Sequence, residues 1–448
     1  MPGLCCFVCG VAGHSADEVR GMLNRVIRNF GVVIRGRGIA GVFSVLATGL
    51  MANALSATEF GLVVLLHTYI MVIRGALNFK TFEAVVRFGI PLNDSGDEAG
   101  FRALLRTTML VDWAAAIVAT LVGIMAASLA ADLLDWEPVM VSWAAVYSLI
   151  MLTTANGTSN GILRVYDRFD AIGVQFTITP ALRFITVAAA WALDASMPVF
   201  IIAWGSAFAI GQFYMFVRGQ VELRAHMSDR LWSGFKWDDL KERGSDFWKF
   251  IRVVYWQTNI DLLPKHVAVL LAGALLGPAA AGLFRLAREF STVLTQPAIA
   301  LREVLFPDLT RSFHAEDGGI RSVPFKAAVI AGMVGLGFVL VSLVFGESIL
   351  GIIGEEYIPA ASLLTLLLIA ASFDLASAPL RAAAYAIGRA GSVLNIHVIG
   401  IIVYVSMFFL MTRLTGLTGP GWAAILASLL AFGLTARLVA RTSGPVQR

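Results

Sequence analysis

The sequence predicts an all-α polytopic membrane protein of about twelve transmembrane helices, arranged as two pseudo-symmetric six-helix lobes around a central cavity. Three observations lead to this prediction. Only 14% of the 448 residues are charged and 58% are hydrophobic, a balance that leaves too little charge to cover a soluble domain of this size. Apolar runs of about 20 residues recur along the chain. Similar segments also repeat at an offset of 221 residues.

The predicted spans are apolar runs bounded by turn residues, such as Gly277-Pro278 and Gly419-Pro420. They are residues 36–54, 60–80, 103–130, 139–160, 171–193, 199–217, 249–273, 279–301, 325–346, 359–380, 390–412 and 420–440. They divide the chain into a cytoplasmic N-terminal segment (1–29), an N-lobe of helices 1 to 6 (30–217), a cytoplasmic inter-lobe loop (218–248), a C-lobe of helices 7 to 12 (249–441) and a cytoplasmic tail (442–448).

The N-terminal segment contains all three cysteines, Cys5, Cys6 and Cys9, with His14 nearby. This spacing supplies half of a zinc site, and the sequence lacks the second half, so no metal is expected. We interpret residues 1–21 as a misassigned start, because Met22 begins a basic lead-in to the first helix.

The distribution of lysine and arginine orients the predicted helices. With the N-terminus placed inside, every Lys and Arg outside the depths of the spans falls on the inner side except Arg413. The outer loops are instead acidic, as at Glu355 and Glu356. Because inner loops of membrane proteins are enriched in cations, we expect both termini in the cytoplasm. The sequence pI near 9.0 is then a topology signal, and no nucleic-acid partner is expected.

The two halves of the chain resemble each other. The segment that opens helix 2 aligns with the one that opens helix 8, which places Gly61 on Gly282. The same offset places the Arg168 turn before helix 5 on the Arg389 turn before helix 11. An offset that spans six helices predicts a parallel repeat, with its axis along the membrane normal.

Several ionisable residues fall inside the predicted spans. Each such charge costs roughly 2.5–3.5 kcal/mol on insertion scales, so it is expected to be paired or functional. The cations are Arg74, Arg183, Lys265, Arg285 and Arg288. Candidate counter-charges or ion-coupling groups are His67, Asp112, Asp261, Glu289 and Asp374.

Only some of these cations have an acidic residue at a helical spacing that would allow an ion pair. Asp261 and Lys265, and likewise Arg285 and Glu289, stand four residues apart on one helix. For Lys265 and Arg285, a structural ion pair and a ligand contact both remain open. Arg74 and Arg183 have no charged residue at their helical neighbours. Arg74 is near enough to the inner end of its helix to extend toward the surface. Pro180 is expected to kink helix 5 and to free a carbonyl for Arg183.

Arg288 is the strongest candidate for binding an anion. It lies three residues from Arg285, and two like charges on one helix face are unfavourable in an apolar site without an anion. His67 aligns with Arg288 under the repeat, so both lobes are expected to present a cation at equivalent depth. Asp112 and Asp374 are interpreted as acids that neutralise these arginines across helices.

Three segments carry a resemblance to a known family. They are residues 57–89 (ATEFGLVVLLHTYIMVIRGALNFKTFEAVVRFG), residues 279–313 with the Phe306-Pro307 stop, and residues 352–370 followed by the Ala386-Ile387-Gly388-Arg389 turn. Together they resemble the bacterial polysaccharide flippases, the Wzx-type proteins of the multidrug/oligosaccharidyl-lipid/polysaccharide exporter superfamily. The resemblance extends over roughly residues 30–440.

This resemblance implies an inner-membrane transporter, not an enzyme, whose helices 1, 2, 7 and 8 line a central cavity. The implied substrate is a polyprenyl-pyrophosphate-linked oligosaccharide for O-antigen, capsule or exopolysaccharide synthesis, moved by alternating access. No cofactor is implied, and an H⁺ or Na⁺ gradient is the implied driving force. Membrane lipids, a polysaccharide polymerase and chain-length machinery are the implied partners. On this template Arg74, Lys265, Arg285 and Arg288 lie on the cavity helices, whereas Arg183 does not.

Two other functions remain as alternatives. A multidrug or cation antiporter of the same superfamily would need an acidic cavity, whereas helices 2, 7 and 8 here carry more cations than acids. A membrane polysaccharide polymerase or glycosyltransferase would need a large outer loop, and the longest outer loop predicted here, from Glu347 to Ile358, is short. No nucleotide, metal or nucleophile motif stands out in the sequence.

Overall fold

The computed structural model describes residues 38–227, 231–233, 245–260, 266–292 and 322–441. Within these residues there are helices and no strands, and each of the twelve predicted spans coincides with helix, helices 7 and 8 only in part. Eight of the helical segments are long and apolar enough to cross a membrane, and the last of them, Gly391–Arg441, contains two predicted spans. The prediction of an all-α polytopic membrane protein is therefore confirmed.

The first half of the chain begins with the helix Gly38–Ala54. It continues with α3 (Ala57–Ala76), α4 (Thr81–Asp94), α5 (Glu98–Met125), α6 (Ala127–Leu134), α7 (Pro138–Ser148), η2 (Leu149–Thr154), α8 (Gly157–Val165), α9 (Phe169–Ala192) and α10 (Met197–His226). The second half contains α12 (Ser245–Ile260), α13 (Ala268–Leu276), α14 (Pro278–Ser291), α16 (Ser322–Ile353), η6 (Glu355–Tyr357), α17 (Ala360–Ala386), α18 (Ala390–Thr415), η7 (Gly416–Thr418) and α19 (Gly419–Arg441).

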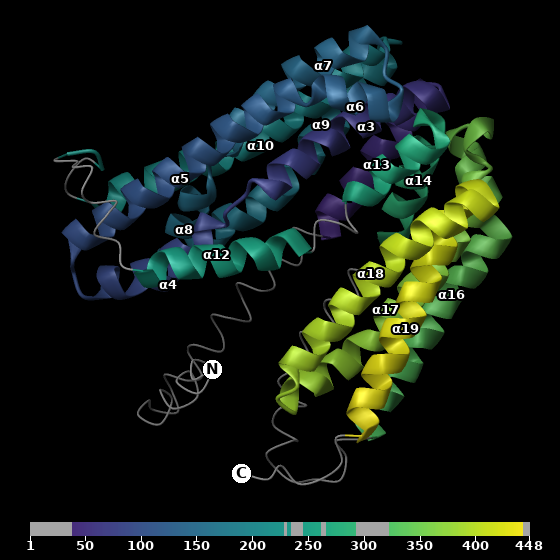
Figure 1. The fold of residues 1–448 in the computed structure, drawn as a ribbon. Coiled ribbons are helices and arrows are strands. Elements are labelled where there is room, and N and C mark those ends of the chain that lie inside the picture. Colours follow the sequence, from purple (N-terminus) through teal and green to yellow (C-terminus); the bar gives the residue numbers. More distant parts are fainter. Residues whose placement is uncertain (1–37, 228–230, 234–244, 261–265, 293–321, 442–448) are drawn as a thin grey trace.

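The helices form two groups that meet at one end and diverge toward the other (Figure 1). One group contains α5 to α10, and the other contains α16 to α19. At the end where they meet, α3 packs against α13 and α14. The largest cluster of buried apolar residues belongs to both groups, and it includes Tyr147 and Phe200 of the first and Leu350 and Leu363 of the second. We call this the closed end.

At the closed end, α3 and α14 cross without room for side chains. A Cβ atom added to Gly61 would lie 1.9 Å from the Pro278 carbonyl oxygen. One added to Gly282 would lie 3.1 Å from the Cα of Gly61. The two glycines that the repeat aligns are thus in direct contact, as expected for residues beside a pseudo-two-fold axis. Glycine is required here because the backbones themselves touch.

Two hydrogen bonds also join the two halves of the chain at this end, and a third holds Asn53 within the first half. Asn53 donates from Nδ2 to the carbonyl of Ile353 at 2.7 Å, and its Oδ1 accepts from the indole of Trp191 at 3.0 Å. The Tyr357 hydroxyl donates to the carbonyl of Leu55 at 3.3 Å. These residues lie at the ends of helices that the sequence predicts to be periplasmic. The diverging end is then the one predicted to face the cytoplasm.

The backbone supports the predicted internal repeat at a second place. Arg168 is the N-cap of α9, and Arg389 is the N-cap of α18. The residues before them, Asp167 and Gly388, both have positive φ, at 55° and 77°. The same tight turn therefore precedes helix 5 and helix 11.

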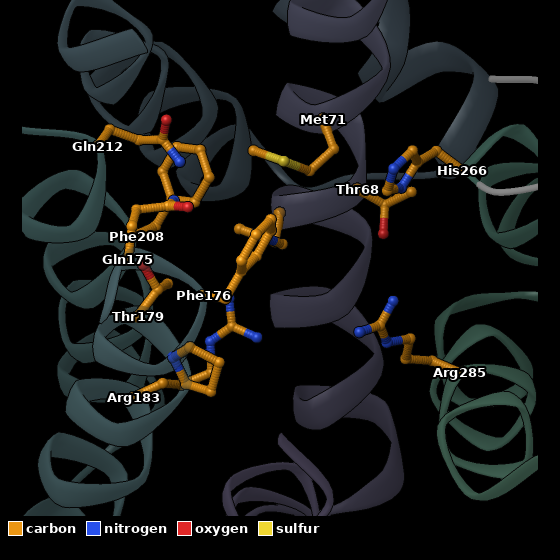
Figure 2. A pocket seen from close by; sticks show the side chains of 12 residues that line it. Thr68, Met71, Gln175, Phe176, Thr179, Arg183, Phe208, Gln212, His266 and Arg285 are labelled. Carbon is orange, nitrogen blue, oxygen red and sulfur yellow. The ribbon is translucent and has the colours of Figure 1, made fainter. Parts of the chain in front are cut away.

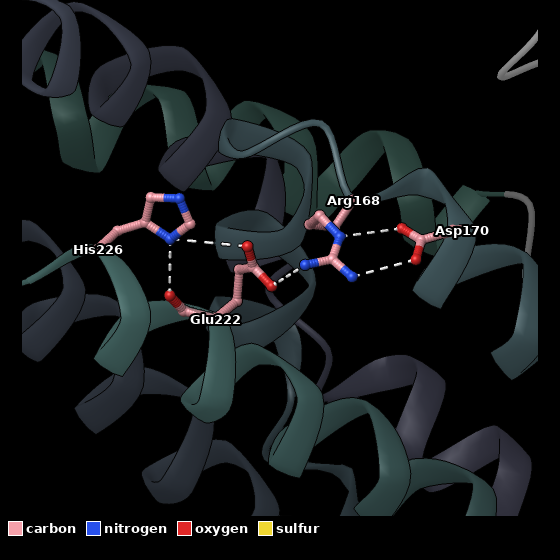
Figure 3. A network of polar contacts seen from close by, with 4 residues as sticks. All are labelled: Arg168, Asp170, Glu222 and His226. Atoms are coloured by element: carbon pink, nitrogen blue, oxygen red, sulfur yellow. Dashed lines mark hydrogen bonds and ion pairs between the residues drawn. The ribbon is translucent and has the colours of Figure 1, made fainter.

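The turn at Arg168 is held by charge (Figure 3). Its guanidinium donates to Asp170 at 3.1 Å and to Glu222 of α10 at 2.5 Å. The Glu222 side chain is only 6% exposed, and it also lies 3.6 Å from Nδ1 of His226. The hydrogen bonds to the two carboxylates raise the pKa of Arg168 above its ordinary value. This network fixes the start of α9 against the end of α10.

The structure differs from the sequence prediction in the first inner loop and in helix 4. Residues 81–94, expected as loop, form the helix α4, whose Ala84 and Val85 are buried. The charged face of α4 lowers the mean hydropathy of this segment below that of a transmembrane span. Helix 4 is broken, since α7 passes through η2 and the helix restarts as α8.

Asp112 of α5 stabilises the restart of helix 4. It accepts hydrogen bonds at 2.6 Å from both the amide and the hydroxyl of Thr158, in the first turn of α8. It also accepts one from Thr81, the first residue of α4, at 2.5 Å. A carboxylate at a helix N-terminus satisfies amides that lack partners inside the helix. Asp112 thus joins three helices.

The first helix of the second half packs against the first half. α12, assigned to the C-lobe, packs against α4 of the N-lobe. Tyr255 of α12 donates to the carbonyl of Ala76 at 2.8 Å and stacks on Phe79. Part of the predicted inter-lobe loop lies outside the described residues. Of the part that is described, the carbonyls of Leu231 and Ser233 accept hydrogen bonds from Arg106.

The α3–α14 crossing predicts that Gly61→Val prevents folding. The added side chain would overlap backbone atoms that no rotamer change can move, at a cost above the roughly 1–3 kcal/mol typical of overpacked cores. Gly337→Val in α16 is the matched control, because a Cβ there meets nothing within 4 Å. Yield of monodisperse protein after detergent extraction measures the effect. Equal yields for both variants would contradict the close crossing.

The predicted orientation is tested by cysteine labelling in a background without Cys5, Cys6 and Cys9. Exposed positions Glu356 and Asp135, changed to cysteine, should react with an impermeant maleimide from the periplasm. Asp94, at the opposite end, should react only after the membrane is opened. Labelling of Asp94→Cys in intact cells would show that the helices are inverted.

Candidate functional site

A cavity of about 300 Å³ lies between α3, α9, α10 and the segment that leads from His266 into α14. Figure 2 shows its lining, with α9 and α10 on one side of α3 and His266 and Arg285 on the other. The lining residues are His67, Thr68, Met71, Gln175, Phe176, Thr179, Pro180, Arg183, Phe208, Gln212, His266 and Arg285. Among these described residues there are two arginines, two histidines and no carboxylate.

Arg183 is held in place by an aromatic ring. Its guanidinium carbon lies 4.1 Å from the ring centroid of Trp204, a cation–π contact. Its Nε is buried and has no hydrogen-bond partner among the described residues. The sequence predicted a carbonyl freed by Pro180 as the partner, whereas the structure supplies the face of Trp204. Arg183 is one of the residues that line the cavity.

Arg285 enters the cavity from α14 with its charge partly compensated. Its Nη2 lies 2.8 Å from Glu289 Oε2, the pair that the four-residue spacing predicted. Glu289 itself does not line the cavity. A bidentate fork has further donors after one carboxylate contact, so Arg285 can still bind a second anion.

His67 lies among basic groups and aromatic rings. Its Nδ1 is 3.0 Å from the hydroxyl of Tyr147, and its ring meets those of Trp204 and Phe208 edge-on. Arg183, Arg285, His266 and Arg74 are the basic groups that act on it electrostatically. The structure therefore brings His67, Arg183 and Arg285 to one place, although the sequence template had left Arg183 outside the cavity.

Two other predicted cations lie beside this cavity without lining it. Arg74 faces Phe208, with its guanidinium carbon 5.5 Å from the ring centroid, and its Nε is buried without a partner among the described residues. Arg288, which the sequence ranked first, lies near Tyr404 of α18 as well as Arg285 and Glu289. It is not among the lining residues.

The predicted acids have local partners that the sequence did not reveal. Asp112 accepts hydrogen bonds from Thr81 and Thr158, and these take the place of the arginine partner that the sequence predicted. Asp374 of α17 is exposed, accepts a hydrogen bond from Ser428 and lies near Arg381. Asp261 and Lys265 lie outside the described residues.

Sequence reasoning missed four of the residues that define this site: Gln175, Gln212, His266 and Trp204. A signal for the two glutamines was present, because amides are costly inside a membrane span and mark contacts there. No signal identified Trp204, since a tryptophan in an apolar helix is usually a packing residue. Full charges mark intramembrane sites more strongly than neutral amides do, so the sequence pattern indicated the arginines and not the amides beside them.

The arrangement suits an anion. Positive side chains held in an apolar surround, with few nearby carboxylates, are unfavourable when empty and become favourable when a negative group binds. Guanidinium groups match phosphate oxygens in shape and charge. The lining contains no nucleophile–base pair, and none of the described His, Cys, Asp and Glu residues gather into a metal site.

No family model matches the chain. Among curated proteins it is similar to the inner membrane protein YghQ of Escherichia coli K12, with 26% identity over 353 residues, which cover 77% of this chain and 97% of YghQ. Among solved structures it resembles an inward-facing multidrug resistance MATE family transporter of the MOP superfamily, with a TM-score of 0.72 and 14% identity over 90% of this chain and 96% of that one.

It also resembles the lipid II flippase MurJ in an inward closed conformation, with a TM-score of 0.67 and 13% identity over 89% of this chain and 86% of that one. At identities this low, the structural likeness establishes the fold alone. The chain therefore has the fold of the MOP-superfamily transporters.

Proposed function

We propose that this protein is a transporter that moves a polyprenyl-pyrophosphate-linked oligosaccharide across the inner membrane for surface polysaccharide synthesis. The observation that carries the proposal is the cavity lined by Arg183, Arg285, His67 and His266, with no carboxylate among its described lining residues. A pyrophosphate is the anion that such a lipid brings to the middle of the membrane. The fold and the likeness to a lipid II flippase support the proposal.

The main rival is a multidrug or cation antiporter, which the likeness to a MATE transporter favours. The cavity argues against it on electrostatic grounds. A cationic drug would lie close to Arg183 and Arg285, and among the described residues Glu289, outside the lining, is the carboxylate that pairs with Arg285. Like charges in a medium of low dielectric repel strongly, so the site would reject such a ligand.

Alternating access would use the contacts at the closed end. With that end predicted to be periplasmic, the lipid headgroup would enter from the cytoplasmic side, where the two groups of helices diverge (Figure 1). Release to the other side requires the Asn53 and Tyr357 hydrogen bonds between the lobes to break. Few hydrogen bonds, each worth about 0.5–1.5 kcal/mol, are compatible with a reversible closure.

The remaining parts of the proposal rest on the family resemblance and on YghQ, which is an inner membrane protein. They are location in the inner membrane with cytoplasmic termini, transport driven by H⁺ or Na⁺, and work alongside a polymerase and chain-length machinery. Arg74 and Arg288 are proposed as supporting cations. They lie close enough to strengthen the field in the cavity without contacting the ligand.

We expect Arg183→Ala to abolish export of the polysaccharide while the protein remains at normal abundance. Loss of a charge-assisted hydrogen bond, worth about 1.5–3 kcal/mol, weakens pyrophosphate binding by roughly 10- to 100-fold. The readouts are surface glycan per copy of inserted protein and the binding of polyprenyl pyrophosphate to the detergent-solubilised chain. Arg183→Lys should retain part of both, because it keeps the charge and loses the fork.

Arg437→Ala is the matched control, since that arginine is exposed on α19 outside the cavity, and it should behave as the unaltered protein. A fully active Arg183→Ala variant would refute the anion site. Tight binding of a lipophilic cation that polyprenyl pyrophosphate fails to displace would instead favour the drug antiporter.

The positions of the arginines predict a graded response. Arg288→Ala should weaken pyrophosphate binding less than Arg183→Ala, because Arg288 does not line the described cavity. Titration of the two variants with the same lipid measures this order. A larger loss for Arg288→Ala would show that the ligand extends from this cavity toward Tyr404 and α18.

A further inference from the structure

The cavity has a second wall that the arginines do not explain. On the α9 and α10 side of α3, two amides, Gln175 and Gln212, lie with two aromatic rings, Phe176 and Phe208 (Figure 2). We call these four residues the amide wall. None of them carries charge, and a pyrophosphate alone would make no use of glutamine carbonyls, which only accept hydrogen bonds.

Gln212 is oriented by a neighbour so that its amide nitrogen remains available. It is 8% exposed, and its Oε1 accepts a hydrogen bond from Asn156 Nδ2 at 2.7 Å. Asn156 Nδ2 also bonds the main-chain carbonyl of Gln212 at 3.1 Å, which identifies it as the donor. With the oxygen engaged, Nε2 is the group of Gln212 that has no protein partner among the described residues.

Gln175 is unpartnered in a different way. It lines the cavity from α9, and neither its oxygen nor its nitrogen makes a hydrogen bond to a described residue. Hydrogen-bond donors and acceptors inside a membrane protein cost free energy when they have no partner, unless water or a ligand forms the hydrogen bond. Thr179, one turn further along α9, also has a hydroxyl without a partner among the described residues, but this hydroxyl is buried against Gly211.

Amides beside aromatic rings suit the chemistry of a pyranose. Sugar hydroxyls are both donors and acceptors, so they pair with the two ends of an amide. The apolar C–H face of the ring packs on Phe176 and Phe208 as other apolar surfaces do. Gln175 and Arg183 are eight residues apart on α9, or roughly 12 Å at 1.5 Å per residue. That separation accommodates a pyrophosphate and one adjoining sugar ring.

We propose that the amide wall binds the lipid-proximal sugar of the substrate, in a subsite next to the cationic one formed by Arg183 and Arg285. The inference rests on the proposed function, and it adds which part of the substrate the protein recognises. A cavity of about 300 Å³ has the volume of roughly ten water molecules, at about 30 Å³ each. It therefore recognises the first sugar, and the remainder of the glycan lies beyond it.

The test compares two lipids on the purified full-length protein: a polyprenyl pyrophosphate and the same lipid bearing one N-acetylhexosamine. The unaltered chain should bind the sugar-bearing lipid about tenfold or more tightly. Gln175→Leu, similar in size and unable to hydrogen-bond, should remove this advantage and leave the affinity for the sugar-free lipid unchanged. Gln175→Asn, which withdraws the amide by one methylene, should give an intermediate preference.

Gln220→Leu is the matched control. Gln220 lies on α10 outside the described cavity lining, and its buried Nε2 has no partner among the described residues, so the same substitution should leave the sugar preference intact. Equal binding of both lipids by the unaltered chain would overturn the sugar subsite while the proposed function stands. Binding of neither lipid would overturn both. A preference that survives Gln175→Leu would assign the sugar to other residues and overturn the amide wall.

Discussion

The structure depends on the contact between the backbones of α3 and α14 at Gly61 and Gly282. With no side chains between them, the two helices approach until the Pro278 carbonyl occupies the place of a Gly61 side chain. This crossing brings together the two halves of the chain at a place where pseudo-equivalent residues meet. From it, α3 runs toward the cavity with His67 and Arg74, and α14 runs toward it with Arg285 and Arg288. The separation of the cationic groups is therefore set by two glycines more than one turn away.

The cavity derives its character from charges that are held and incompletely paired. Arg183 stacks on Trp204, and Arg285 pairs with Glu289, which lies outside the described lining. Insertion of such residues into a membrane is expensive, and packing alone would favour apolar residues of similar volume. An anionic ligand is the simplest physical reason for retaining them. The neutral amides opposite add directionality, since hydrogen bonds specify geometry where charge alone does not.

Asp112 shows that a sequence pattern can identify a residue that needs a partner without identifying the partner. Asp112 is an intramembrane acid, and the cost of burying it predicts a partner. The partner proved to be the start of α8 and the hydroxyl of Thr81, not an arginine across the membrane. A break in helix 4 created amides in need of an acceptor, and hydropathy does not detect such a break. The same limitation hid α4, whose charged face made a packed helix resemble a loop.

By itself the sequence determined the fold class, the positions of the spans, the internal repeat and the presence of cations within the membrane. Each of these depends on composition, local periodicity or chain offset, which are properties of neighbouring residues. Only the tertiary structure decided that Arg183 and Arg285 share a cavity, that Arg288 lies outside its described lining, and that α12 packs on the N-lobe. Residues 183 and 285 come from different lobes, and the helix rotations that bring their side chains together are set by inter-helix packing. No local pattern encodes those rotations, because they follow from how closely helices such as α3 and α14 can approach.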